Sequence, residues 1–176
     1  MIMRAVSTGA VAVLIVAMMP LSMVDALCER DLMFLLDSSG SVDDDFLDMR
    51  EFIHQVSVNV LNIGRQSHHV ALLQYSSASR KTKWPRFDFD KITSNKQFYD
   101  IVDNLRAIRG LTNTAEAFEM TREMLRARRR PRKWPIVIHV SDGRAFNFPR
   151  AAKVAAEIRA DDVIIGSAAL ADPVNL

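Results

Sequence analysis

Residues 30–41, which read RDLMFLLDSSGS, decide the fold of this chain. The first part is a short apolar run that ends in Asp37, and such a run is typical of a central parallel strand buried on both faces. The second part is a serine-rich turn around Gly40, where the missing Cβ lets the backbone bend sharply. We therefore expect a buried strand over 30–37 and a tight loop directly after it.

Apolar spacing along the rest of the chain predicts helices that alternate with strands. Helices are expected over 46–63, over 94–105 with a capping box at Ser94, over 112–128 and over 151–158. Strands are expected over 69–75, 81–87, 135–140 and 163–169. The 81–87 strand contains Pro85 and is expected at an edge of the sheet. This order predicts an α/β fold: a doubly wound, mostly parallel sheet with helices on both faces.

Length and composition fit one globular domain. The chain has 176 residues, of which 49% are hydrophobic and 25% charged, a balance that suits a packed core and excludes a disordered chain. The formal net charge of +2 gives little indication of partners, and we expect no nucleic acid among them.

Residues 1–26 have the three-part pattern of a secretory signal peptide. Arg4 precedes an apolar run over 10–19, and small residues around Ala26 suit cleavage. The apolar run is short for a membrane span, so we expect no stable span after cleavage and a secreted, extracellular domain over 27–176. The single cysteine, Cys28, would then lie at the tip of the mature chain, where it bridges to another chain or has lost its partner.

Oxygen-bearing side chains are concentrated where two predicted core strands end. Asp37, Ser39 and Ser41 follow the first strand, and Asp142 follows the strand over 135–140. Ligands of such sheets bind beyond the carboxyl ends of the strands, and oxygen ligands suit a hard cation such as Mg²⁺ or Mn²⁺. The alternative for DSSGS alone is a turn whose polar residues cap the next helix.

Three motifs in order, D-x-S-x-S at 37–41, T-N-T at 112–114 and S-D-G at 141–143, resemble the metal-ion-dependent adhesion site of von Willebrand factor type A domains. The resemblance implies that Ser39, Ser41 and Thr112 bind the ion directly, whereas Asp37 and Asp142 act mainly through ordered water. It further implies that a glutamate or aspartate of an extracellular protein, such as collagen or a cell-surface receptor, completes the shell. Three neutral oxygens leave the cation electrophilic, which favours an incoming carboxylate.

The resemblance covers about 28–176, and the chain differs from the family at its end. Family members usually continue with a short helix, an edge strand and a last helix, which are absent from this sequence. We therefore expect a C-terminally incomplete domain in which Ile164 and Ile165 are exposed on an uncovered strand.

A basic run follows the predicted helix over 112–128: Arg126, Arg128, Arg129, Arg130, Arg132 and Lys133. These cations could bind sulfated glycans or another acidic surface. They could equally be a solvated helix end, where positive charge complements the helix dipole.

Adhesion or matrix binding without catalysis is the function that these features favour. Two alternatives are a structural matrix domain with an idle metal site and a magnesium-dependent hydrolase. The hydrolase is disfavoured because the sequence has neither a G-x-x-x-x-G-K loop nor a G-x-S-x-G elbow.

Overall fold

The computed structural model describes residues 30–43, 45–64, 67–128, 130, 134–143 and 147–170. Its strands are β1 (Asp31–Asp37), β2 (His69–Tyr75), β3 (Arg86–Ile92), β4 (Ile136–Ser141) and β5 (Ile164–Ala169). Its α-helices are α1 (Phe46–Val60), α2 (Asn95–Asn104), α3 (Thr114–Arg128) and α4 (Phe148–Ala160), with short 3-10 turns at Gly40–Val42 and Ala78–Lys83. Within these residues no helix is both long and apolar enough to cross a bilayer.

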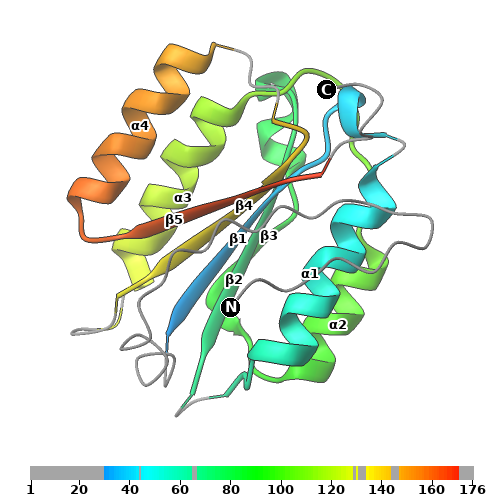
Figure 1. Cartoon of the computed structure of the whole chain (residues 1–176), viewed down its shortest axis with the longest axis vertical. Coiled ribbons are helices and arrows are strands. Elements are labelled where there is room, and N and C mark those ends of the chain that lie inside the picture. The colour runs from blue at the N-terminus through cyan, green and yellow to red at the C-terminus, as the bar shows by residue number, and fades with distance from the viewer. Residues whose placement is uncertain are drawn as a thin grey trace, which may run out of the picture.

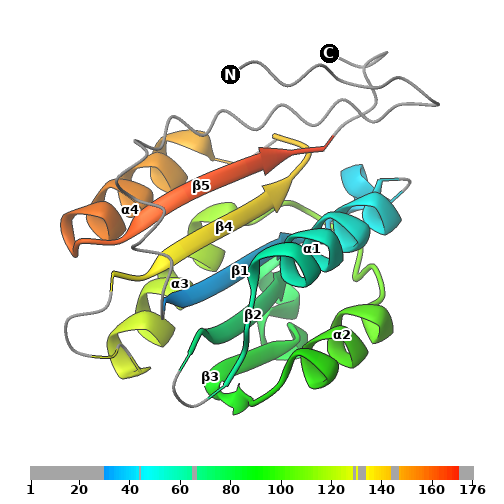
Figure 2. The ribbon, with the colours of Figure 1, turned by 60° about the horizontal axis from the view of Figure 1, so that its bottom comes forward.

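The five strands form one sheet in the order β3-β2-β1-β4-β5. β1 pairs in parallel with β2 and with β4, and β4 pairs in parallel with β5, whereas β3 is antiparallel to β2. Helices α1 and α2 cover one face and α3 and α4 the other (Figures 1 and 2). The expected doubly wound, mostly parallel fold is therefore confirmed.

The central strand β1 contributes to both halves of the core, because its side chains alternate between the two faces. Met33 and Leu35 pack on the side of α3 and α4, whereas Phe34 and Leu36 pack on the side of α1 and α2. Every residue of β1 is buried. The sequence of β1 contains an uninterrupted apolar run because helices cover both faces of this strand.

Two expected element boundaries are corrected by the structure. The strand expected over 81–87 begins only at Arg86, after Pro85, because a proline has no N–H to donate to a strand ladder. Helix α1 ends at Val60, so Gly64 lies beyond it. Ser94 caps the start of α2 as expected, since the Gln97 N–H donates to Ser94 Oγ at 3.2 Å, but the Gln97 side chain accepts from the Thr93 N–H at 2.8 Å and not from that of Ser94.

Strand β5 forms the edge of the sheet opposite β3. The expectation that Ile164 and Ile165 are exposed there is wrong, because both are partly buried and Ile165 packs against the core under α3 and α4. The exposed positions of this edge strand are instead the small residues Gly166, Ser167 and Ala169.

Candidate metal site

Three loops meet at the carboxyl ends of the parallel strands. The loop after β1 is joined to the loop before α3 by two backbone bonds, from Gly40 N to the Gly110 carbonyl at 2.8 Å and from Arg109 N to the Ser38 carbonyl at 2.8 Å. Gly110 has φ +107°, and a Cβ there would stand 2.2 Å from Ser77 Oγ. A side chain at position 110 would be strained by the positive φ and would displace Ser77 Oγ, so glycine suits this junction.

Hydroxyl groups from two of these loops form a continuous cluster. Thr112 Oγ1 donates to Ser39 Oγ at 2.9 Å, and Ser39 Oγ lies 3.1 Å from Ser41 Oγ. Ser39 is fully buried, Thr112 is partly exposed and Ser41 is exposed. The cluster therefore has a buried side and a side that faces solvent.

Asp37 lies beneath the hydroxyl cluster and is inaccessible to solvent. Its Oδ1 accepts from the Ser39 N–H at 2.9 Å, and its Oδ2 accepts from Tyr75 OH at 3.1 Å and from Ser141 Oγ at 3.2 Å. Burial raises the pKa of Asp37 to about 6, and the charge of nearby Asp142 adds to this shift. A cation beside this carboxylate would favour its ionised form.

Tyr75 and His139 extend the network into the sheet, and neither was predicted as a site residue. Tyr75 OH lies 2.9 Å from His139 Nε2 and 3.3 Å from Thr114 Oγ1. Burial lowers the pKa of His139 to about 4, so its ring is neutral near pH 7. In the Nε2–H tautomer His139 donates to Tyr75, which donates to Asp37. Both strands contain other polar residues, such as Gln74 and Ser141, so no sequence signal singles out Tyr75 and His139.

The five residues predicted from sequence thus lie at one edge of the sheet. Ser39, Ser41 and Thr112 are in mutual contact, Asp37 contacts Ser39, and the buried Asp142 is close enough to Asp37 to affect its pKa. No group of three or more His, Cys, Asp or Glu side chains that could hold a metal occurs in the described part of the chain. The donors predicted from sequence are two carboxylates and three hydroxyls, an all-oxygen set that fits a hard cation.

Two members of the predicted basic patch form ion pairs with acidic residues. Arg126 contacts Asp161 at 3.0 Å, and Arg130 contacts the buried Asp31 at 2.7 Å. Arg130 thereby joins the segment after α3 to the start of β1. The side chain of Arg128, together with Arg129, Arg132, Lys133, Cys28 and the predicted signal peptide, lies outside the described residues.

An open, mostly parallel sheet with buried carboxylates and hydroxyls at its strand ends defines a class, the α/β domains whose ligand site lies at the carboxyl edge. The chain belongs to the von Willebrand factor type A domain family, whose sequence model matches residues 31–175. The expected family is therefore confirmed.

Curated relatives include proteins of the extracellular matrix. The chain is 28% identical over 114 residues to the collagen alpha-6(VI) chain of Homo sapiens, which covers 64% of this chain and 5% of the relative. It is 33% identical over 96 residues to von Willebrand factor A domain-containing protein 1 of Danio rerio, covering 54% and 18% respectively. The chain thus spans a small part of the curated relatives that it matches.

Solved structures share the fold at low sequence identity. Proximal thread matrix protein 1 from the mussel byssus, solved with a zinc-occupied MIDAS motif, matches with a TM-score of 0.68 and 19% identity over 79% of this chain and 37% of that chain. The manganese-loaded TRAP protein of Plasmodium vivax matches with a TM-score of 0.62 and 19% identity over 79% and 56%. These likenesses support the fold class.

Proposed function

We propose that this chain is a secreted, non-enzymatic adhesion module that binds a divalent cation, Mg²⁺ or Mn²⁺, through Asp37, Ser39, Ser41, Thr112 and Asp142. Through that ion it would bind an exposed Asp or Glu of an extracellular protein, with a matrix protein such as a collagen or a cell-surface receptor as the partner. The bound ion would supply an electrophilic position for the partner's carboxylate.

The contact between Thr112 and Ser39 carries this proposal. These hydroxyls come from positions 73 residues apart and lie 2.9 Å from each other, directly above the buried Asp37. A helix cap would not require a hydroxyl from a second loop at this point. The opening of the cluster toward solvent at Ser41 leaves room for an outside ligand, which a closed structural site does not need.

The residues have separate tasks in this proposal. The three hydroxyls would donate neutral oxygens, while the two aspartates would supply the negative charge that holds the ion. Tyr75 and Ser141 orient the Asp37 carboxylate by donating to Oδ2. Such supporting hydrogen bonds keep ligands in place and typically affect metal affinity about 10- to 100-fold.

The comparisons support the extracellular and matrix aspects of the proposal, since one curated relative is a collagen VI chain and one structural neighbour is a thread matrix protein. Two structural neighbours are described with bound zinc or manganese, which supports the proposal of a divalent cation. We propose sulfated glycans as a second class of partner, which would bind to the basic run over 126–133.

Calorimetric titration of the folded chain with MgCl₂ and with MnCl₂ tests the metal site. We expect uptake of one ion, loss of uptake in Thr112→Ala, and unchanged uptake in Ser67→Ala, which removes a hydroxyl near the start of β2. Binding to a panel of matrix proteins, in magnesium and in chelator, tests the partner. Uptake of no ion by folded protein would refute the first part, and equal partner binding in chelator would refute the second.

A further inference from the structure

A groove lies between the helices α3 and α4 and the strands β4 and β5, with a volume of about 340 Å³. That volume is in the range of small-molecule sites. The groove exists because α4 presents small side chains toward β5, which itself carries small residues. Its walls include Ala151, Ala152 and Ala155 of α4 and Ser167, Ala168 and Ala169 of β5.

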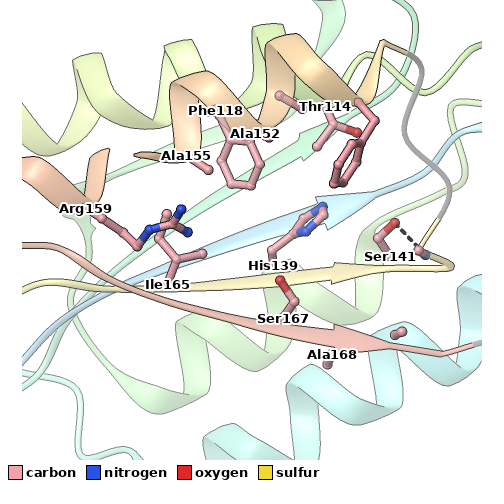
Figure 3. A pocket seen from close by; sticks show the side chains of 14 residues that line it. Thr114, Phe118, His139, Ser141, Ala152, Ala155, Arg159, Ile165, Ser167 and Ala168 are labelled. Atoms are coloured by element: carbon pink, nitrogen blue, oxygen red, sulfur yellow. Dashed lines mark hydrogen bonds between the residues drawn. The ribbon is translucent and has the colours of Figure 1, made fainter. Parts of the chain in front are cut away.

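The groove is mainly apolar along its length, and its polar side chains are few. In Figure 3, Phe118 and Ile165 face the space from opposite sides. Thr114 and Ser141 lie toward one end and Arg159 toward the other (Figure 3). Phe148, at the start of α4, is 68% exposed and adds an aromatic ring to the lining.

Among the described residues that line the groove, Arg159 is the charged one, and none is Asp or Glu. Other arginines of the helical layer are paired: Arg122 with Glu157 and Asp161, and Arg150 with Glu116 and Glu119. Within the part of the chain that the structure describes, Arg159 has no ion pair. Its place in the last turn of α4 suits the helix dipole, but the dipole does not require its guanidinium to be directed over the groove as in Figure 3.

We propose that this groove binds a small amphipathic carboxylic acid. Its hydrocarbon part would lie between Phe118, Ala155 and Ile165, where burial of apolar surface provides affinity. Its carboxylate would accept two hydrogen bonds from the Arg159 guanidinium, whose planar fork matches a carboxylate. Because none of the described lining residues is acidic, the groove favours an anion over a neutral or cationic ligand.

The groove is separate from the proposed cation site but adjoins it. Ser141 and His139 are among its lining residues, and both belong to the hydrogen-bond network of Asp37. The acid would bind through Arg159 and the apolar walls, none of which is a proposed metal ligand. Binding measured in chelator therefore tests the groove independently of the cation site.

Calorimetric or NMR titration of the full chain in EDTA with octanoate, and in parallel with octanamide, tests the proposal. We expect octanoate to bind roughly tenfold or more tightly than octanamide, because charge-assisted bonds are stronger than neutral ones. Arg159→Gln should abolish this preference and leave octanamide binding unchanged. Lys153→Gln removes a cation from the same helix outside the groove and should keep the preference.

Ala152→Leu supplies a second variant, because it places a bulky side chain in the groove at an exposed helix position that tolerates substitution. It should weaken both ligands at least tenfold while the melting temperature stays near that of the wild type. Equal binding of octanoate and octanamide to the wild type would overturn the proposal. So would a preference that survives Arg159→Gln, or the absence of any binding at millimolar octanoate.

Discussion

Replacing Asp37 by asparagine should stabilise the metal-free protein. Asp37 is fully buried, and burial raises its pKa from 3.8 to about 6. Because each pKa unit corresponds to about 1.36 kcal/mol, the ionised carboxylate costs the folded state about 3 kcal/mol at pH 8. Asparagine is nearly isosteric and removes the charge. We therefore expect Asp37→Asn to be more stable than the wild type by about 1–3 kcal/mol in EDTA at pH 8.

The hydrogen bonds around the side chain permit this gain. The carbonyl oxygen of the introduced asparagine can accept from the Ser39 N–H, as Oδ1 of Asp37 does now. The amide nitrogen would face Tyr75 OH, which can accept from it and donate instead to the neutral His139 ring at 2.9 Å. The substitution removes a buried charge, and the Ser141 hydroxyl loses its acceptor at Oδ2, which offsets part of the gain.

The pH dependence fixes the sign of the effect. Because the pKa of Asp37 is raised on folding, the cost is fully present above about pH 6 and vanishes below 3.8, where both states are protonated. The stability difference between variant and wild type should therefore shrink as the pH falls from 7 to 4. His139 titrates in both proteins, so its contribution largely cancels in this comparison.

Urea denaturation followed by tryptophan fluorescence measures the effect, since Trp84 is buried beside the Tyr75 ring. Saturating magnesium should reverse the order, because the wild type gains binding free energy that the variant lacks. Asp43→Asn is the control, as it removes an exposed carboxylate paired with Arg109 and should change stability by less than about 1 kcal/mol. A variant less stable than the wild type in EDTA, or a difference independent of pH, would refute the reasoning.

Three further substitutions, two of them with a matched control variant, test other parts of the structure. In thermal denaturation, Gly110→Ala should lower the free energy of unfolding by about 1–3 kcal/mol, because the φ of +107° disfavours a side chain. Gly166→Ala is its control and should change the free energy of unfolding little, because a Cβ added there meets no atom within 4 Å. Arg130→Gln should cost about 3–5 kcal/mol in urea denaturation because it leaves a buried aspartate uncompensated, whereas Arg126→Gln at an exposed pair should cost less than about 1 kcal/mol. Tyr75→Phe should weaken magnesium binding roughly tenfold in calorimetry, because it removes a donor to the buried aspartate; unchanged affinity would contradict this role.

The sequence alone was sufficient for the fold class and for most elements. The apolar run of 31–37 predicts a strand covered on both faces, and β1 is buried throughout. The capping box at Ser94 predicts the start of α2, because its hydrogen bonds involve neighbours three or four residues apart. These signals come from residues that are close together in the chain, so they can be recognised in the sequence without the structure. The start of β3 was missed because Pro85 acts as a boundary rather than as an irregularity within a strand.

Contacts between distant parts of the chain required the tertiary structure. The motifs predicted that Ser39 and Thr112 share a site, but their 2.9 Å separation depends on how the loops are joined through Gly40 and Gly110. Nothing local distinguishes Tyr75 and His139 from other strand residues, and they become a network only because β2 and β4 flank β1. Likewise, the sequence shows Arg130 only as one cation in a basic run, whereas in the fold it forms an ion pair with the buried Asp31. Sequence specifies the donors, whereas strand order and burial decide which donors meet and what charge they hold.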